Sequence, residues 1–182
     1  MIGRLNFAAR IGAAMLAIGI CAGALAQKNE DTKSLVGKSM PEFSMTTLDG
    51  KTITNADLKG KVVLLDFWAT WCPPCKKTSP VVQKLHETYG GQGVTFIGAD
   101  CWEKGDAKDL AQKYVDEHKY SYTVTIKNDE LSKTLMVRGI PTLVLVDGTG
   151  VIRNVFIGYS DKLQGELEAA IKNLMKSNGA GN

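Results

Sequence analysis

The sequence has few of the residues that build disulfide frameworks or metal centres. Only four cysteines and two histidines occur among its 182 residues. This number is too small for a disulfide-stapled framework in a chain of this length. A structural zinc site needs about four nitrogen or sulfur ligands, and no cysteine or histidine is spaced to complete one around a cysteine pair. The few cysteines are therefore expected to serve reactivity.

The chain also lacks a strong charge of either sign. It has 22 lysines and arginines against 19 acidic residues, and Arg4 and Arg10 are the only charges in the first 26 residues. Without these two arginines, 20 basic residues face 19 acidic ones, which leaves a net charge of +1. A balance this close to zero provides no electrostatic basis for binding nucleic acid or an anionic membrane surface.

The first segment is apolar but too short for an ordinary membrane span. Residues 11–25 are almost wholly apolar, whereas a spanning helix needs about 20 such residues. The run follows two arginines and closes with Ala24-Leu25-Ala26, a small-x-small pattern typical of signal peptidase sites. We predict a signal peptide over residues 1–26 and export to the periplasm. Retention of this segment as a membrane anchor is the alternative.

The rest of the chain has no internal repeat and no linker, which indicates a single domain. Its composition, with 44% hydrophobic and 23% charged residues, is ordinary for a soluble globular protein. We predict a flexible lead-in over residues 27–40, a folded domain over residues 41–176 and a loose tail over residues 177–182.

Hydrophobic patterning within this domain predicts an α/β fold. Continuous apolar runs at residues 62–65 and 94–99 are typical of buried central strands, and a helix is predicted between them over residues 73–89. This order favours parallel central strands. Hairpins turning at residues 49–50 and 147–150 would add antiparallel strands. Further elements are predicted as a strand over residues 122–126 and helices over residues 104–118, 131–136 and 162–175.

The chemistry-bearing motif is Cys72-Pro73-Pro74-Cys75, which lies where a strand becomes a helix. Cysteines at i and i+3 across a helix start can close a small disulfide and open it again. Unpaired N–H groups and the helix dipole stabilise a thiolate at this position, and proline is tolerated in the first helical turn. We predict that Cys72 is the exposed attacking thiolate and that Cys75 resolves the mixed disulfide.

Three residues near this motif have two possible interpretations each. Asp66 is the only carboxylate locally placed to take a proton from Cys75, but it could also be a strand-end residue facing solvent. Trp71 adjoins Cys72 and could offer a flat apolar surface to a docking peptide, or it could be a structural aromatic. Cys101 follows the strand at residues 94–99, either as a small packed residue or as a third redox thiol.

The motif and its surroundings resemble the thioredoxin superfamily. Residues 66–76 (DFWATWCPPCK) resemble its active-site strand, turn and helix. Pro80 stands at its helix-kink position, and Gly139-Ile140-Pro141-Thr142 resembles its cis-proline loop. The resemblance covers residues 37–175 and implies a thioredoxin fold, with a central mixed sheet flanked by helices and an extra N-terminal hairpin.

This resemblance also implies roles for individual residues. Asp66 is expected to be the buried carboxylate that moves the proton of Cys75. Pro141 is expected to be cis, to place the substrate backbone beside the thiols and to exclude metal from them. No cofactor is expected. The expected client-binding residues are Trp71, Pro73, Pro74, Ile140 and Pro141.

Within the superfamily, the chain is most similar to the exported TlpA/ResA-like branch. The signal sequence, the N-terminal hairpin and the Trp-Ala-Thr-Trp-Cys run carry this similarity. Members of the branch reduce disulfides outside the cytoplasm, often during cytochrome c maturation. Several carry a glutamate three residues after the second cysteine, where this chain has Thr78, so the site resembles ordinary thioredoxin more than an apocytochrome-specific reductase.

Three functions remain open from the sequence. The first is a monomeric reductant of disulfide-containing client proteins, regenerated by a thiol electron donor in the membrane. The second is an oxidant that introduces disulfides, and the third is a binding module whose two cysteines hold copper or zinc. The region between Cys75 and Pro141 has no large insertion, which resembles reductants rather than DsbA with its inserted helical region. The first function is therefore the main prediction.

Overall fold

The computed structural model describes residues 31–179. The predicted signal peptide over residues 1–26 lies outside the described residues. Within the described residues, no helix combines the length and the apolar character needed to cross a membrane.

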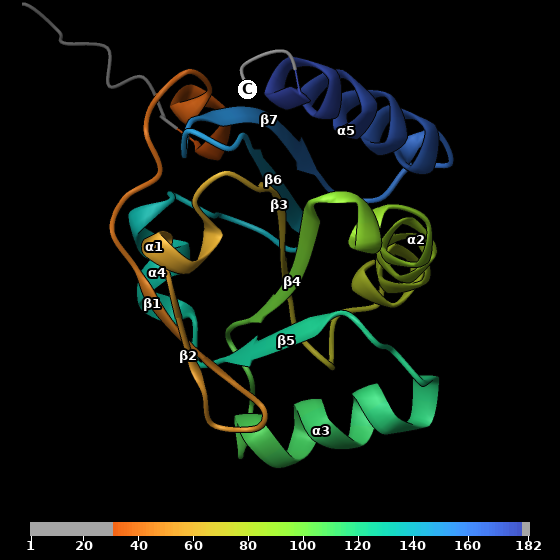
Figure 1. The fold of residues 1–182 in the computed structure, drawn as a ribbon. Coiled ribbons are helices and arrows are strands. Elements are labelled where there is room, and N and C mark those ends of the chain that lie inside the picture. The colour runs from red at the N-terminus through yellow and green to blue at the C-terminus, as the bar shows by residue number, and fades with distance from the viewer. Residues whose placement is uncertain (1–30, 180–182) are drawn as a thin grey trace, which may run out of the picture.

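One seven-stranded mixed sheet forms the centre of the molecule (Figure 1). Its strands lie in the order β2-β1-β5-β4-β3-β6-β7. The central strands β3, β4 and β5 are parallel, and the two hairpins β1–β2 and β6–β7 add antiparallel strands at the two edges. This arrangement confirms the predicted α/β fold with its extra N-terminal hairpin. The strands are β1 (Ser44–Thr47), β2 (Thr52–Thr54), β3 (Val62–Trp68), β4 (Val94–Asp100), β5 (Thr123–Ile126), β6 (Thr142–Val146) and β7 (Ile152–Ile157).

Helices cover both faces of the sheet. In Figure 1, α2 and α5 lie on one side, and α1 and α4 lie on the opposite side. Side chains of α3 join those of α2 and α5 in one hydrophobic core, whereas the other core is completed by α4 and the N-terminal segments. The helices are α1 (Asn55–Leu58), α2 (Cys75–Tyr89), α3 (Ala107–His118), α4 (Asp129–Thr134) and α5 (Leu163–Gly179), with 3-10 turns η1 (Thr32–Leu35) and η2 (Gly90–Gln92).

The strand β3 shows why the apolar run of the sequence is continuous. All seven of its residues are buried, because both faces of the sheet are covered. Successive side chains of a strand point to opposite faces, so Leu64 and Trp68 lie in the core with α2, while Leu65 and Phe67 lie in the other core. The same alternation directs Asp66 to the face that carries α2.

The helix boundaries differ from the prediction where local chemistry decides them. The helix α2 begins at Cys75, after the two prolines, rather than at Pro73. The helix α3 begins at Ala107 rather than at residue 104, because the Asp106 carboxylate accepts hydrogen bonds from the N–H groups of the first turn. The helix α5 continues to Gly179, so the predicted loose tail over residues 177–182 is wrong for residues 177–179.

The predicted flexible lead-in over residues 27–40 is wrong for its described part. Hydrogen bonds join the Gly37 N–H to the Ile152 carbonyl and the Met40 N–H to the Gly150 carbonyl, each at 2.8 Å. The Met40 side chain is buried in the core on the α4 side. These hydrogen bonds and the buried Met40 side chain hold residues 31–40 against the β6–β7 hairpin. The polar side chains of the segment give no sign in the sequence that its backbone pairs with the sheet edge.

Candidate active site

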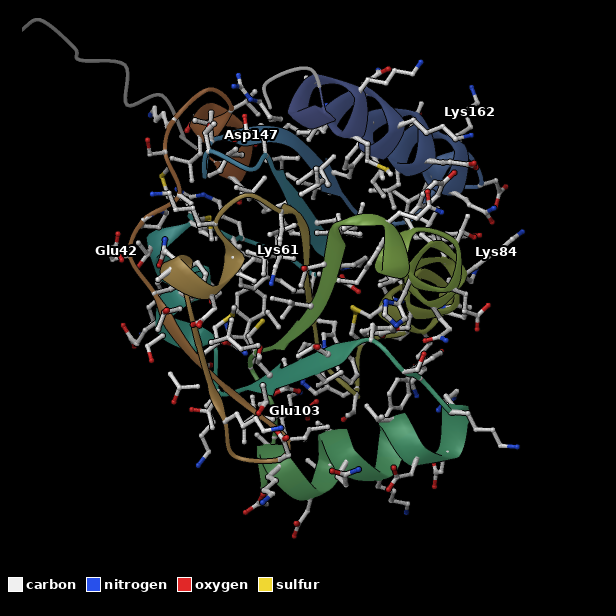
Figure 2. The ribbon with its side chains drawn as sticks, in the orientation of Figure 1. Glu42, Lys61, Lys84, Glu103, Asp147 and Lys162 are labelled. Carbon is white, nitrogen blue, oxygen red and sulfur yellow. A yellow bond between two sulfur atoms is a disulfide. The ribbon has the colours of Figure 1, made fainter. Side chains whose placement is uncertain are left out.

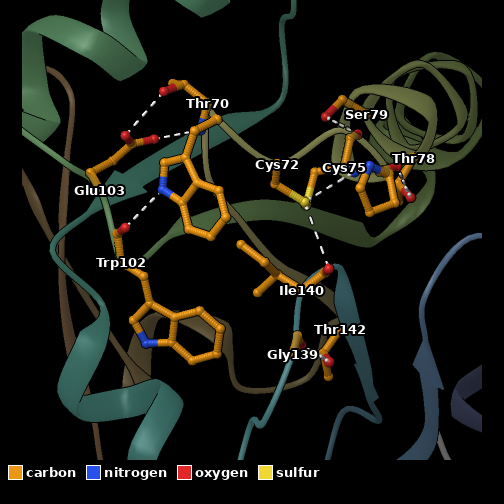
Figure 3. Close-up of a disulfide and its surroundings, with 12 residues drawn as sticks. Thr70, Cys72, Cys75, Thr78, Ser79, Trp102, Glu103, Gly139, Ile140 and Thr142 are labelled. Atoms are coloured by element: carbon orange, nitrogen blue, oxygen red, sulfur yellow. Dashed lines mark hydrogen bonds between the residues drawn. A yellow bond between two sulfur atoms is a disulfide. The ribbon is translucent and has the colours of Figure 1, made fainter.

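The two cysteines of the motif form a disulfide at the junction of β3 and α2 (Figure 3). Their Cα atoms lie 5.3 Å apart. A turn closed by a 3.2 Å hydrogen bond from the Cys72 N–H to the Ala69 carbonyl leads into the motif. The Cys75 N–H points at the Cys72 sulfur, with 3.2 Å between nitrogen and sulfur. This N–H is one of the donors that a helix start leaves unpaired, and it can stabilise a thiolate on Cys72 once the disulfide is reduced.

The sulfur of Cys72 is not the exposed atom that the sequence predicted. Cys72 is only 2% exposed and Cys75 only 1%. The Cys72 sulfur lies 3.6 Å from the Ile140 carbonyl oxygen (Figure 3), so the loop before β6 covers it from the other side of the site. The neighbours Trp71, Pro73 and Pro74 are exposed instead, and they provide the accessible surface around the pair.

The loop that faces the disulfide has the predicted conformation. The bond between Ile140 and Pro141 is cis. Ile140 is half-buried and Pro141 is buried. The Thr142 hydroxyl donates a 2.7 Å hydrogen bond to the Gly139 carbonyl, which closes the turn before β6 (Figure 3). The tertiary structure therefore brings together two segments that are about 70 residues apart in the chain.

Asp66 is a buried carboxyl group without a partner. It is fully buried, and neither of its oxygens has a hydrogen-bond partner among the described residues. The interpretation of Asp66 as a solvent-facing strand end is therefore wrong. Burial without compensation disfavours the charged form, and it raises the pKa of Asp66 to about 7. A carboxyl group with this pKa can both accept and release a proton near neutral pH.

A second segment, which lies outside the residues predicted for the site, holds the loop that precedes Cys72. The Glu103 carboxylate accepts hydrogen bonds from the Thr70 N–H and, at 3.0 Å, from the Thr70 hydroxyl. The indole N–H of Trp71 donates a 2.8 Å hydrogen bond to the Trp102 carbonyl (Figure 3). The ammonium group of Lys104 lies 4.7 Å from the centroid of the Trp71 ring. These contacts fix the Trp71 ring beside the disulfide.

Strand register contains the signal that could have identified this segment. Strands β3 and β4 are parallel, and Trp68 is paired with Asp100 at their carboxyl ends. The residues that follow each strand must therefore meet at the same edge of the sheet. Asp100 is buried there, and its burial together with the negative charge of Glu103 raises the pKa of Asp100 to about 8.

Cys101 is a free thiol that packs away from the disulfide. It is fully buried in the core on the α4 face, whereas Cys72 and Cys75 belong to the core on the α2 face. Burial raises the pKa of the Cys101 thiol, which suppresses its reactive thiolate form. The geometry thus favours the small packed residue over the third redox thiol. Within residues 31–179, no three His, Cys, Asp or Glu side chains are grouped so that they could hold a metal ion.

Comparisons with known proteins agree with this geometry. The sequence matches the redoxin family over residues 35–171. It is 38% identical to the thiol-disulfide oxidoreductase ResA of Bacillus thuringiensis (strain Al Hakam) over 144 residues, which cover 78% of this chain and 80% of the relative. It is 33% identical to the thiol:disulfide interchange protein DsbE of Pseudomonas fluorescens biotype C over 161 residues, which cover 87% and 86% of the two chains.

A solved structure shows the same fold. The crystal structure of a thiol:disulfide interchange protein of the thioredoxin family from Chlorobium tepidum TLS superposes with a TM-score of 0.66 and 29% identity. The match covers 75% of this chain and 95% of that one. With a redox-active cysteine pair at the start of α2 and relatives of this kind along most of its length, the chain belongs to the redoxin family and is a thiol–disulfide oxidoreductase with a thioredoxin-like fold.

Proposed function

We propose that this chain is exported and reduces disulfide bonds of extracytoplasmic proteins. The observation that carries this proposal is the buried, unpaired Asp66 on the sheet face that also holds Cys75. Such a group supplies what a dithiol reductant needs, namely a proton acceptor near neutral pH for the second thiol. Export is supported by the signal-like pattern of residues 1–26.

The reaction proceeds in two exchange steps. The Cys72 thiolate attacks one sulfur of the client disulfide, so a Cys72–client disulfide forms and the other client sulfur leaves as a thiolate. Asp66 then takes the proton of Cys75, and the Cys75 thiolate attacks the Cys72 sulfur. This second step closes the Cys72–Cys75 disulfide and releases the second client thiolate. Two electrons pass to the client, and a thiol donor in the membrane returns them to the protein.

The electrostatics around the cysteine pair favour reduction over oxidation. A strong disulfide oxidant stabilises its reduced form, chiefly as a thiolate. Here an unpaired buried carboxyl lies on the same side of the sheet, and its negative charge above about pH 7 opposes a thiolate on either cysteine. The lysines that follow the motif, Lys76 and Lys77, are exposed, so water and salt screen their charge.

Client binding is assigned to the surface around the disulfide. Trp71, Pro73 and Pro74 are exposed beside the cysteines, and Ile140 and Pro141 face them from the opposite loop. An extended client segment lying between these two groups would place its disulfide over Cys72. We propose that the protein works as a monomer, without a cofactor and without nucleic acid.

The alternative is an oxidant that introduces disulfides into exported proteins. It uses the same cysteines in the reverse direction, and the observation in its favour is the Cys75 N–H that points at the Cys72 sulfur. A thiolate held by this donor would stabilise the reduced form. The two directions differ in the reduction potential of the pair.

The experiment is an equilibration of the full chain against glutathione and dithiothreitol buffers, with the oxidised fraction read by thiol alkylation and mass. A potential near that of thioredoxin, about −270 mV, is expected. A value near −120 mV, the range of DsbA, would overturn the reductant assignment. The Asp66→Asn variant serves as the internal test, because removal of the buried charge should make the potential at pH 8 less negative.

A further inference from the structure

The surface beside the disulfide carries a cation fixed over its exposed aromatic ring. Trp71 is 41% exposed, and its indole N–H is bound to the Trp102 carbonyl. The Lys104 ammonium lies 4.7 Å from the centroid of this ring, a distance at which the π face attracts a cation. The aromatic surface and the positive charge are therefore positioned together before any client binds.

Two further lysines extend the positive charge along the start of α2. Lys76 and Lys77 directly follow Cys75 and are both exposed. The Lys77 ammonium lies 5.6 Å from the centroid of Tyr159, a residue between β7 and α5 that is also exposed. We call Lys76, Lys77 and Lys104 the lysine rim. Two of its members follow Cys75 in α2, and the third lies after β4 and contacts Trp71.

Nearby acidic residues of the described chain form no ion pair with this rim. The Glu103 carboxylate is turned toward Thr70, from which it accepts two hydrogen bonds. Asp161 accepts a 3.4 Å hydrogen bond from the Tyr159 hydroxyl. In the part of the chain that the structure describes, no lysine of the rim forms an ion pair, whereas Lys51, Lys113, Lys133 and Lys172 do. The charge of the rim is therefore available to a partner.

We propose that the Trp71–Lys104 pair and the lysine rim select client segments that carry Asp or Glu beside the disulfide-bonded cysteine. The exposed indole contacts apolar parts of the segment, and the Lys104 ammonium contacts the carboxylate. Complementary charge raises the association rate and excludes partners of like charge. This inference rests on the proposed function and adds to it a class of substrate, namely acidic segments of disulfide-bonded proteins.

The test measures reduction of three peptides by the reduced full chain in single-turnover reactions. Each peptide has one intramolecular disulfide, and the three differ only in whether Glu, Gln or Lys flanks the cysteines. At low ionic strength the second-order rate constant should fall in the order Glu, Gln, Lys, with the Glu peptide on the order of tenfold faster than the Lys peptide. In about 0.5 M salt this ratio should shrink to within about twofold.

Substitutions test whether the lysine rim causes the difference in rate between the Glu and Lys peptides. Lys104→Gln should remove most of the preference, and Lys104→Arg should restore it. The matched control is Lys84→Gln, because Lys84 is an exposed lysine of α2 that points outward from that helix (Figure 2), and this variant should keep the wild-type ratio. Equal rates for the three peptides, or a ratio that Lys104→Gln does not change, would overturn the inference while leaving the reductant function intact. Failure to reduce any of the three would instead count against the proposed function.

Discussion

Replacement of Asp66 by Asn should change the pH dependence of stability in the oxidised protein. The carboxyl group of Asp66 is fully buried and has no hydrogen-bond partner among the described residues. Its pKa rises from 3.8 to about 7 on folding because burial penalises the charged form. Between these two values the folded state holds a proton that the unfolded state has released. The free energy of unfolding therefore decreases as pH rises from about 4 to about 7, and this loss is complete above pH 7.

The size of the effect follows from the shift. About three pKa units, at 1.36 kcal/mol each, correspond to about 4 kcal/mol. Asn carries no charge at any pH, so the variant does not undergo this loss. Relative to the wild type, Asp66→Asn should gain about 4 kcal/mol of stability between pH 4 and pH 8. A constant cost of burying the Asn amide shifts both ends equally and leaves this difference unchanged.

Urea unfolding at pH 4, 6 and 8 measures this difference, with the disulfide kept oxidised so that Cys72 and Cys75 do not titrate. Asp109→Asn is the control, because Asp109 is exposed in the first turn of α3. Its stability relative to the wild type should vary by less than about 1 kcal/mol over the same range. A difference between Asp66→Asn and the wild type that stays constant with pH would refute the reasoning, since it would mean that the carboxyl keeps its ordinary pKa in the fold.

Three other substitutions test the surroundings of the site. Thr70→Val removes the hydroxyl that donates to Glu103, and it should lower the free energy of unfolding in urea by about 1 kcal/mol. The same variant should raise KM for a protein client more than it lowers kcat. Thr70→Ser should restore both the stability and the KM. Cys101→Ala should leave the reduction potential unchanged in glutathione buffers, because the thiol is buried on the opposite core; a shift of more than about 15 mV, or about 0.7 kcal/mol, would contradict this. Gly98→Ala should cost about 1–3 kcal/mol, seen as a lower Tm, because a Cβ there would lie 3.0 Å from the Trp68 indole nitrogen and from the Tyr122 ring. An unchanged Tm would show that these rings move aside at little cost.

Local patterns of the sequence were sufficient for most elements of the fold. The apolar runs of β3 and β4 and the turn residues of both hairpins correspond to strands in the structure. Element ends were less accurate than the elements themselves, and for α3 the reason is a side-chain cap. The start of α3 depends on the Asp106 side chain, and the extension of α5 to Gly179 covers residues that were expected to be loose.

Predictions for the site were correct where the interacting residues are close in the sequence and wrong or missing where they are far apart. The Cys72–Cys75 pair has a separation of three residues and was evident from the motif. The segment of Trp102 and Glu103 is more than 30 residues from the loop that it holds, and no local pattern marks it. The predicted exposure of Cys72 failed for the same reason, because the residue that covers it, Ile140, is 68 positions away.

By itself, the sequence determined which atoms can react and on what kind of scaffold they lie. The spacing of Cys72 and Cys75 at a strand-to-helix junction is local chemistry, and hydrophobic period is a local property of each segment. The tertiary structure alone decided the burial and charge of the site. Asp66 has a pKa of about 7 only because the folded chain buries its carboxyl group away from water. Trp71 is held beside Lys104 only because β4 lies next to β3. Desolvation and long-range contact are sums over residues distant in the chain, so no window of the sequence contains them.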